Sequence, residues 1–285
     1  MKIGVTVNLF DNGYGRFGED IYNKVKEHGF SAVDFSMADE SSVLYTNYQG
    51  QIESILVHHK QLAEAADVEI YQAHGPWRYP PKDDDESQRD FWLEKMKKAI
   101  YFTSLLGCKN FVVHPLIPNG FEDLDNKKAK STYKINYAFF TELLDTAKDF
   151  GVTICLENMP WSSFSLSKPE AILKLVKDIK DDNFQICLDT GHVNVIPKLN
   201  LLREVKRLGE HIKAIHVHDN VARLDSHLFP LYGNIDFIGF ADALKSVGFD
   251  GAFSLETGPS HKLPTSVFED MSKSLNEIAK YIISE

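Results

Sequence analysis

The sequence predicts a single (β/α)8 barrel (TIM barrel) spanning residues 1–285, with its active site at the carboxyl-terminal rim of the strands. Eight short apolar runs alternate with eight longer helical patterns along the chain. Several helical patterns end at a glycine just before the next run, and no linker or change of composition divides the chain. A doubly wound open sheet is the alternative, but it does not explain the polar residues described below.

The elements follow from two different periodicities. Runs rich in Val, Ile and Phe predict strands at 3–8, 31–36, 68–74, 110–115, 152–158, 184–192, 212–219 and 251–258. Apolar residues recurring every three or four positions predict helices at 19–29, up to about 67, 87–107, 132–151, 168–179, 199–209, 236–248 and 265–282. Glycine closes helices readily, and five patterns end at Gly29, Gly107, Gly151, Gly209 and Gly248.

Composition narrows the class of protein. The chain is 43% hydrophobic and 25% charged, which is ordinary for a globular protein. No apolar run approaches the roughly 18 residues of a membrane helix, and no signal-peptide pattern is found. Two of the three cysteines, Cys155 and Cys187, lie in strand runs, so we expect free thiols and a cytoplasmic location. The net charge of −10 disfavours nucleic acid, although a local basic patch would remain compatible with it.

Six consecutive strand runs end in a residue that can bind a metal ion or move a proton. Because side chains alternate along a strand, these six should point into the barrel together, above a layer that lies two positions earlier. That layer is mostly small or apolar, as a packed interior requires: Gln72, Val112, Cys155, Cys187, Ala214 and Ser254. The six strand-end residues are His74, His114, Glu157, Asp189, His216 and Glu256.

Further imidazoles and carboxylates follow the same strands. His192 comes three residues after Asp189, and the "DSH" stretch supplies Asp225 and His227. In "AIHVHDN", His218 stands two residues after the strand-end histidine and should point to the same side. So many His, Asp and Glu side chains suit Zn²⁺, Mn²⁺, Co²⁺ or Fe²⁺ better than a catalytic triad. Neither a GxSxG motif nor a glycine-rich nucleotide loop is found.

Each of these residues also has a structural interpretation. A strand-end histidine such as His114 often serves only as a hydrogen-bonded rim residue, and Asp225 with His227 could form a loop salt bridge. Four polar groups left unpaired at one buried mouth would be costly, so a purely structural role is disfavoured for Glu157, Asp189, His216 and Glu256. Aromatic residues after strand ends suit either packing or a wall of the site that contacts a ligand: Trp77, Trp161, Phe10 and Tyr14.

The motifs resemble one known superfamily. The series "QAHGPW", "VVHP", "CLENM", "CLDTGH", "IHVHDN…DSH", "GNIDF" and "SLET" is similar to the xylose isomerase-like barrels, in strand order and over nearly the whole chain. Its sugar and sugar-phosphate isomerase and epimerase branch implies one divalent-metal site, formed here by Glu157, Asp189, His216 and Glu256. By that pattern His216 is the ligand, while His218 contacts substrate or a carboxylate such as Asp219.

The related endonuclease IV branch, also called AP endonuclease family 2, implies three zinc ions. His74, His114 and Glu157 would hold the first, and the four residues above the second. His192, Asp225 and His227 would hold the third. Loops favour the other branch, because an abasic-site nuclease needs basic loops. Here the loop at 75–87 becomes strongly acidic, and the loop at 193–199 is short and barely charged.

The resemblance therefore implies a divalent-metal-dependent sugar or sugar-phosphate isomerase or epimerase that works through an enediolate. Mn²⁺ or Zn²⁺ would be the cofactor, with Co²⁺ or Mg²⁺ as alternatives, and homo-oligomers are common in this branch. Glu157 and Glu256 would remove and return the proton. Substrate contacts are expected from His192, His218, Trp77 and Asn8. Asn158 could orient the neighbouring Glu157, although strand alternation turns it outward.

Three other functions stay open. A trinuclear-zinc phosphodiesterase of endonuclease IV type would act on abasic-site DNA. A metal-dependent dehydratase or lyase could use the same enediolate chemistry on a related sugar. A non-catalytic barrel would bind a sugar or metal without exchanging substrate protons.

Overall fold

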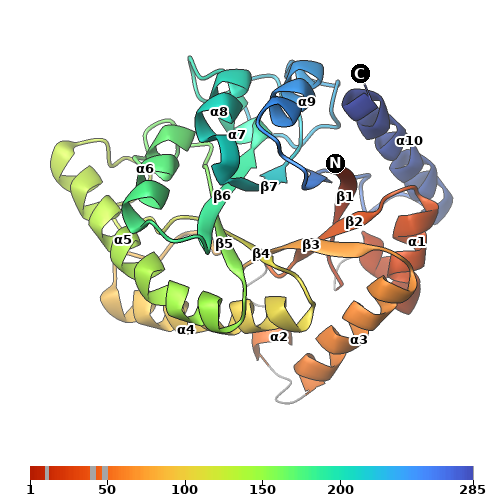
Figure 1. Ribbon diagram of the computed structural model, residues 1–285, viewed down its shortest axis with the longest axis horizontal. Helices are drawn as coiled ribbons and strands as arrows, with labels where there is room; N and C mark the ends of the chain where they lie inside the picture. The colour runs from red at the N-terminus through yellow and green to blue at the C-terminus, as the bar shows by residue number, and fades with distance from the viewer. Residues whose placement is uncertain (10–12, 39–42, 47–50, 285) are drawn as a thin grey trace.

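Eight parallel strands form the centre of the molecule, as the computed structural model shows for residues 1–9, 13–38, 43–46 and 51–284 (Figure 1). The predicted (β/α)8 barrel is confirmed. The strands are β1 (Lys2–Val7), β2 (Ala32–Ser36), β3 (Glu69–His74), β4 (Asn110–Val113), β5 (Thr153–Glu157), β6 (Phe184–Asp189), β7 (Ile212–His216) and β8 (Ala252–Leu255).

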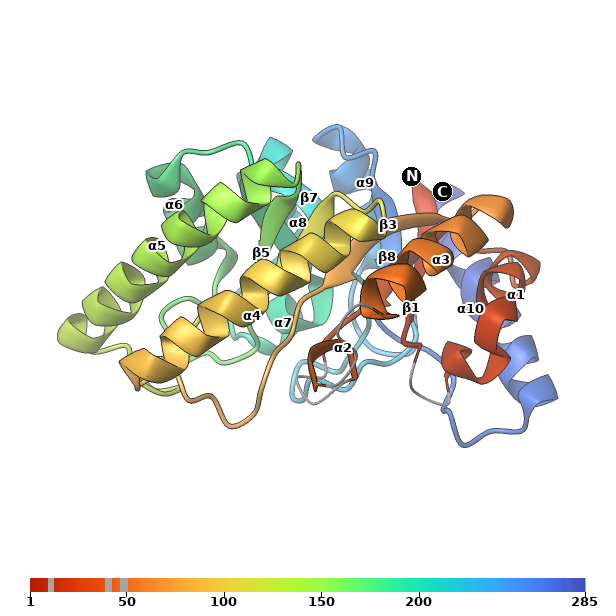
Figure 2. The same ribbon diagram turned by 90° about the horizontal axis from the view of Figure 1, so that it is seen from below.

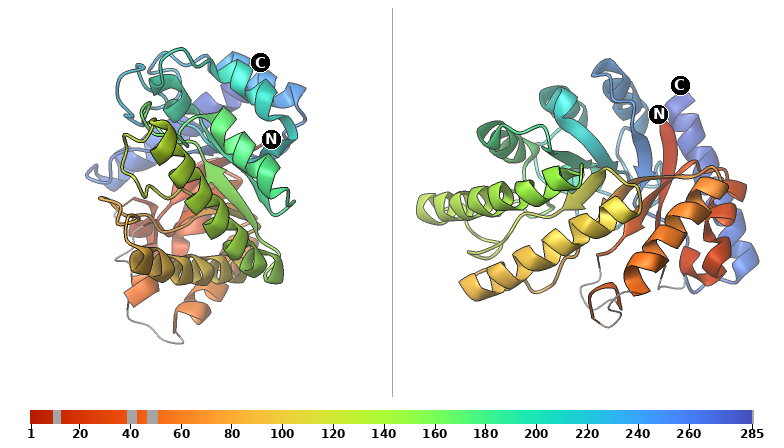
Figure 3. Two further views of the ribbon diagram at one scale, coloured as in Figure 1. Left: turned by 90° about the vertical axis from the view of Figure 1, so that its left-hand side faces the viewer. Right: turned by 60° about the horizontal axis from the view of Figure 1, so that its bottom comes forward.

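Each strand pairs with its neighbours in chain order, and β1 pairs in parallel with β8. The ring closes between β7 and β8 through one residue beyond the end of β7. Val217 donates its N–H to the Ser254 carbonyl at 2.8 Å and accepts from the Glu256 N–H at 3.0 Å. The two chain termini consequently lie close together (Figures 1 and 3). This closure fixes Glu256 beside His216, at the rim where the site lies.

Helices surround the strands, and the long α4 and α5 run along one side (Figure 2). The principal helices are α1 (Ile21–Glu27), α3 (Gln51–Ala65), α4 (Glu86–Leu105), α5 (Asn126–Asp149), α6 (Pro169–Ile179), α8 (Leu201–Leu208), α9 (Phe237–Ser246) and α10 (Thr265–Ser284). Shorter segments are η1 (Tyr14–Asp20), α2 (Val43–Thr46), α7 (Thr190–Val195) and η2 (Gly209–His211).

Two helix boundaries differ from the sequence expectation. Helix α5 begins at Asn126 rather than near residue 132, because Asp125 caps it by accepting the N–H groups of Lys127 and Lys128. The helical pattern expected up to about residue 67 contains α2 and α3, while 39–42 and 47–50 lie outside the described residues.

The interior layer follows the predicted alternation. Val112, Cys155, Cys187 and Ala214 form one buried apolar cluster inside the barrel. All three cysteines are buried and free, as expected. Within the part of the chain that the structure describes, no helix is long and apolar enough to cross a membrane.

Candidate metal and acid–base site

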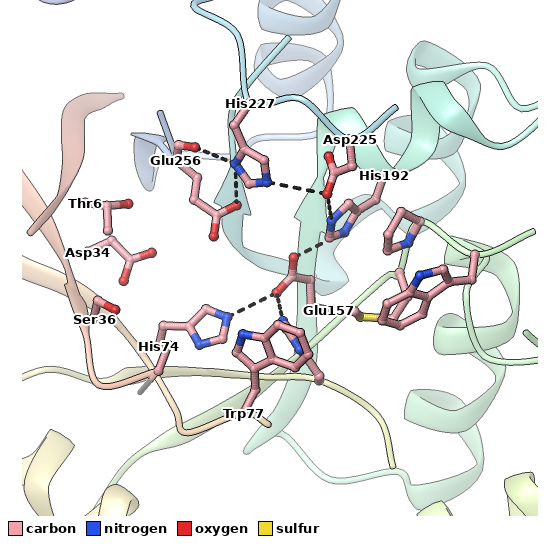
Figure 4. Close-up of a pocket in the computed structure, with 15 residues that line it drawn as sticks. Thr6, Asp34, Ser36, His74, Trp77, Glu157, His192, Asp225, His227 and Glu256 are labelled. Carbon is pink, nitrogen blue, oxygen red and sulfur yellow. Dashed lines mark hydrogen bonds and ion pairs between the residues drawn. The ribbon is translucent and has the colours of Figure 1, made fainter. Parts of the chain in front are cut away.

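The carboxyl ends of the strands bring the predicted residues together around one cavity (Figure 4). Glu157, Asp189, His216 and Glu256 come from β5, β6, β7 and the residue after β8. Each offers one donor atom, and the four atoms lie within 4.8 Å of one another. The strand-end rule therefore places the four predicted primary ligands correctly in space. Their role as ligands remains a prediction.

His216 stands at the centre of this group and is fully buried. Its Nε2 lies 2.9 Å from Asp34 Oδ2. A carboxylate can only accept, so Nε2 carries a proton. Burial opposes it, but the surrounding acidic groups raise the pKa of His216 well above its usual range, so Nδ1 is free to bind a cation only once its own proton has left. Nδ1 lies 3.2 Å from Glu157 Oε1 and 3.4 Å from Glu256 Oε2. Nδ1 of His216 thus points between two carboxylates.

Three of the possible metal-ligand atoms in this group are buried and have no hydrogen-bond partner among the described residues. These atoms are His216 Nδ1, Glu157 Oε2 and Glu256 Oε2. An unpaired buried polar group costs about 1–3 kcal/mol, so three facing atoms need a common partner. A divalent cation meets this need, because imidazole nitrogen and carboxylate oxygen are ligands of Zn²⁺ and Mn²⁺. The residues present therefore fit a metal ion.

Other histidines are oriented in the way His216 is, by one ring nitrogen held on a fixed acceptor. Nδ1 donates to a backbone carbonyl in three rings, which leaves Nε2 facing inward. The pairs are His74 with Gly75 at 2.8 Å, His192 with Asn158 at 2.7 Å, and His227 with Glu256 at 2.8 Å. This arrangement suits metal ligation, because the orientation of each ring is set before an ion binds and only the inward-facing Nε2 has to be free of its proton.

Glu157 also connects the primary group to the ligands expected for a first additional ion. Its Oε2 lies 3.5 Å from His74 Nε2 and 3.2 Å from His114 Nε2, at ion-pair distance but without hydrogen-bond geometry. His74, Glu157 and His216 alone also form a compact group of possible ligands. The structure thus brings His74 and His114 to the same carboxylate.

The ligands expected for a third ion gather on Asp225. Its Oδ2 lies 3.0 Å from His192 Nε2 and 3.4 Å from His227 Nε2. His227 has a φ of 44°, an uncommon conformation for a residue with a side chain. Its ring stacks on His218 with centroids 3.8 Å apart. These contacts hold the ring of His227 over the cavity.

Burial and charge separate the pKa values of the two central carboxyls. Although burial opposes it, His216 and His114 hold the pKa of Glu157 well below its usual range. Burial raises the pKa of Glu256 against the pull of His216, and the negative charges of Glu157 and Asp189 raise it further. One carboxyl is thus favoured as an ionised base and the other as a proton donor.

The outer histidines are held in their charged form when no cation is bound. Burial lowers the pKa of His192, but Asp189 and Asp225 raise it to about 10. Burial also lowers the pKa of His227, but Asp225 and Glu256 raise it to about 9. Any additional metal would have to displace these protons.

The cavity has a volume of about 230 Å³. It is lined by Thr6, Asp34, Ser36, Ala38, His74, Trp77, His114, Glu157, Met159, Pro160, Trp161, His192, Asp225, His227 and Glu256. Asn8, expected to contact substrate, lines an adjoining cavity of about 260 Å³ that shares Thr6, Ser36 and Glu256 with the first. Tyr14 lies in that second cavity as well, while Phe10 is outside the described residues.

Two sequence expectations about neighbours need correction. His218 contacts a carboxylate, one of the two alternatives expected, but this carboxylate is Asp189 rather than Asp219. Its Nε2 lies 3.0 Å from Asp189 Oδ2, while Asp219 accepts from backbone N–H groups of its own loop. His218 itself is fully buried behind the cavity wall. Asn158 does not orient Glu157, because it points to β6 and pairs with the backbone of Asp189.

Asp34 is the main functional residue that the sequence interpretation missed. It lies within β2 rather than at its end, and it is 1% exposed. Besides His216, it accepts from Gln72 Nε2 at 2.8 Å. A carboxylate in the middle of an otherwise apolar strand was the available signal. The short α7 was also missed: Asp189 caps it by accepting the His192 N–H at 2.6 Å.

A (β/α)8 barrel with paired acid and base groups at its carboxyl rim is the architecture of an enzyme. Residues 22–280 match the family described as xylose isomerase-like TIM barrel. The chain belongs to this family, so the fold and the resemblance read from the motifs are both confirmed.

Three relatives show the range of the family. The uncharacterized protein MJ1311 of Methanocaldococcus jannaschii is 31% identical over 237 residues, which are 82% of this chain and 76% of that protein. The crystal structure of a D-tagatose 3-epimerase-like protein is 27% identical with a TM-score of 0.77, covering 100% of this chain and 97% of that one. Probable endonuclease 4 of Mycoplasmopsis agalactiae is 29% identical over 175 residues, 55% of this chain and 56% of that protein.

Proposed function

We propose that the protein is a divalent-metal-dependent isomerase or epimerase of a sugar or sugar phosphate. The observation that carries this proposal is the buried His216 Nδ1, without a hydrogen-bond partner among the described residues, between two carboxyls whose pKa values are shifted in opposite directions. Similarity over the full chain to a D-tagatose 3-epimerase-like protein supports the substrate class. Three buried free thiols support a reducing, cytoplasmic compartment.

Glu157, Asp189, His216 and Glu256 would hold the cation. Bound there, Mn²⁺ or Zn²⁺ would polarise a substrate carbonyl and its neighbouring hydroxyl. In our proposal Glu157, held ionised, removes the proton from the carbon beside that carbonyl. Glu256, on the other side of His216, supplies a proton to the same carbon in an epimerase or to the adjacent one in an isomerase.

The remaining residues of the cavity bind and orient the sugar. His192 and His227 line the cavity, and their raised pKa values let them donate a proton to a substrate oxygen as negative charge develops. Trp77 offers a ring face next to His114, with centroids 5.4 Å apart. Asn8 would contact the part of the sugar that extends into the adjoining cavity.

The trinuclear phosphodiesterase remains a second candidate, because all nine of its expected ligands lie around this cavity or contact its lining residues. The metal content of protein purified without chelator distinguishes the two. About one ion per chain agrees with the four-ligand site. Close to three zinc ions, together with cleavage of abasic-site DNA that chelator abolishes, would favour the nuclease.

The role of Glu256 is tested by Glu256→Gln. Loss of one acid–base group lowers turnover about 10²- to 10⁴-fold. The variant should keep its fold, which circular dichroism checks. Glu210→Gln, at an exposed position, is the matched control and should retain full activity. Near-normal turnover by Glu256→Gln would refute the role assigned to this residue.

A further inference from the structure

Four aromatic rings form a continuous lip on one side of the cavity. Trp77 and Trp161 both line the cavity, and Figure 4 labels Trp77 among the lining residues. The rings of Tyr79 and Phe121 lie between the two tryptophans and complete the row from Trp77 to Trp161. The centroid separations are 6.2 Å for Trp77–Tyr79, 6.0 Å for Tyr79–Phe121 and 4.5 Å for Phe121–Trp161.

The outer part of this aromatic lip is open to solvent. Tyr79 is 71% exposed, and its ring stacks on Phe121 with planes inclined by 30°. Neighbouring Leu124 is 59% exposed. Exposed apolar surface bordering a binding cavity commonly marks a contact with a ligand or partner. The lip thus begins next to the reacting groups and extends the site outward.

Buried polar contacts hold the lip in place. Arg78, next to Tyr79, lies 3.1 Å from Asp83 and over the ring of Trp92 at 4.4 Å. Asp83 in turn accepts the Ile117 N–H at 2.8 Å, which joins the loop after β3 to the loop after β4.

A second buried carboxylate joins the loop after β4 to the loop after β5. Asp123 is fully buried and accepts both the N–H and the hydroxyl of Ser165, at 2.6 and 2.8 Å. Ser163 donates its hydroxyl to the Phe121 carbonyl at 3.0 Å. The rings are therefore ordered before any ligand arrives, which lowers the entropic cost of binding.

The charges around the lip select the kind of ligand. The three loops that carry it, residues 75–85, 115–125 and 158–167, hold two basic residues and six acidic ones. Of the basic residues, Arg78 is paired with Asp83. A nucleotide or another phosphate would meet net repulsion here. A neutral pyranose ring avoids this repulsion and places its C–H face on an aromatic ring.

We infer that the lip of Trp77, Tyr79, Phe121 and Trp161 is an outer subsite for a second sugar ring. The substrate is then a ketose or keto sugar that carries a glycosyl unit, with its carbonyl end at the acid–base site and its glycosyl unit on Tyr79 and Phe121. This inference rests on the proposed function of the inner site.

Binding is measured separately from chemistry through tryptophan fluorescence. The chain has three tryptophans: Trp77 and Trp161 in the lip, and Trp92 beneath Arg78. The metal-loaded protein is titrated with fructose and with three glycosylated fructoses, namely isomaltulose, lactulose and maltulose. We expect at least one disaccharide to shift the emission at a concentration about five- to tenfold below that needed for fructose.

Variants assign the difference to the lip. Tyr79→Ala should remove most of the disaccharide advantage and change fructose binding less than twofold, whereas Tyr79→Phe, which keeps the ring, should retain it. Tyr281→Ala is the matched control, because Tyr281 is an exposed tyrosine (53%) on α10. Its disaccharide binding should equal that of the wild type.

Three results would overturn the inference. The first is that no disaccharide binds more tightly than fructose up to 50 mM. The second is an equal effect of Tyr79→Ala on one-ring and two-ring sugars. The third is conversion of an oligomer to monomer by Tyr79→Ala in light scattering with unchanged sugar binding, which would make the lip a subunit interface. Disaccharide binding without exchange of any carbon-bound hydrogen would instead refute the proposed function and leave the subsite standing.

Discussion

One buried carboxylate, Asp34, holds a proton on Nε2 of His216 and so orients its ring. Replacing Asp34 by Asn leaves the size of the side chain unchanged but removes the negative charge that holds the proton on Nε2. We expect Asp34→Asn to weaken Zn²⁺ or Mn²⁺ binding about 10- to 100-fold. Calorimetric titration measures this, and Asp67→Asn, at an exposed position, is the control. Equal affinities in wild type and Asp34→Asn would show that Asp34 does not tune the site.

Among single residues, the sequence predicted the candidate ligands better than the residues that orient them. The strand-end residues could be found, because eight parallel strands deliver their last side chains to one rim. Asp34 could not be placed by that rule, since it lies inside β2. The partner of His218 was also beyond reach, because β7 ends at His216 and the loop that follows sets the direction of His218.

Helix α3 carries a histidine that makes stability depend on pH. His59 contacts the rings of Tyr22 and Phe35, and its Nδ1 is buried without a hydrogen-bond partner among the described residues. Burial and the neighbouring His58 lower the pKa of His59 to about 4, with only a small opposing effect from Glu19. The folded protein therefore binds this proton less readily than the unfolded chain does, near pH 6.5.

Stability should consequently fall as the pH drops from about 6.5 towards about 4, by roughly 1–2 kcal/mol for this partly exposed group. We expect His59→Gln to lose less stability than the wild type over this range. Chemical unfolding of both proteins at pH 7.5 and 5 measures the difference. The same loss in both would mean that His59 is not responsible.

The other elements show where local patterns were sufficient. Glycine stops and periodicity placed the eight principal units, but α7 was hidden within a run assigned to a strand. A helix this short has almost no periodic signal, and it exists because Asp189 caps it. The close approach of His218 to Gly191 was equally invisible: a Cβ on Gly191 would lie 2.0 Å from the His218 ring.

At the scale of the whole molecule, an ion at the rim would link β5, β6, β7 and β8. A ligand that binds only the folded chain stabilises it by about 2.7 kcal/mol at a hundred times its Kd. For a chain of this length that raises Tm by about 4 to 5 °C. Thermal unfolding with added Mn²⁺ or Zn²⁺, and again with chelator, measures the shift.

Glu256→Gln should reduce this shift in Tm, because Glu256 belongs to the four-residue group. An identical shift in this variant, or none in the wild type, would argue that cations do not bind at these residues.

Chain closure through β1 and β8 was predictable from the count of units. The sequence did not reveal that the backbones of β7 and β8 are joined by hydrogen bonds of Val217, one residue beyond the end of β7.

The most direct test of the proposed function is the exchange of a carbon-bound substrate hydrogen with solvent. Metal-loaded protein is incubated in D₂O with a panel of ketoses, aldoses and their phosphates, and nuclear magnetic resonance follows deuterium at the carbon beside the carbonyl. We expect deuterium there in at least one sugar, abolished by chelator and restored by Mn²⁺ or Zn²⁺. Tight sugar binding by the metal-loaded protein without any exchange would contradict proton transfer by Glu157 and Glu256.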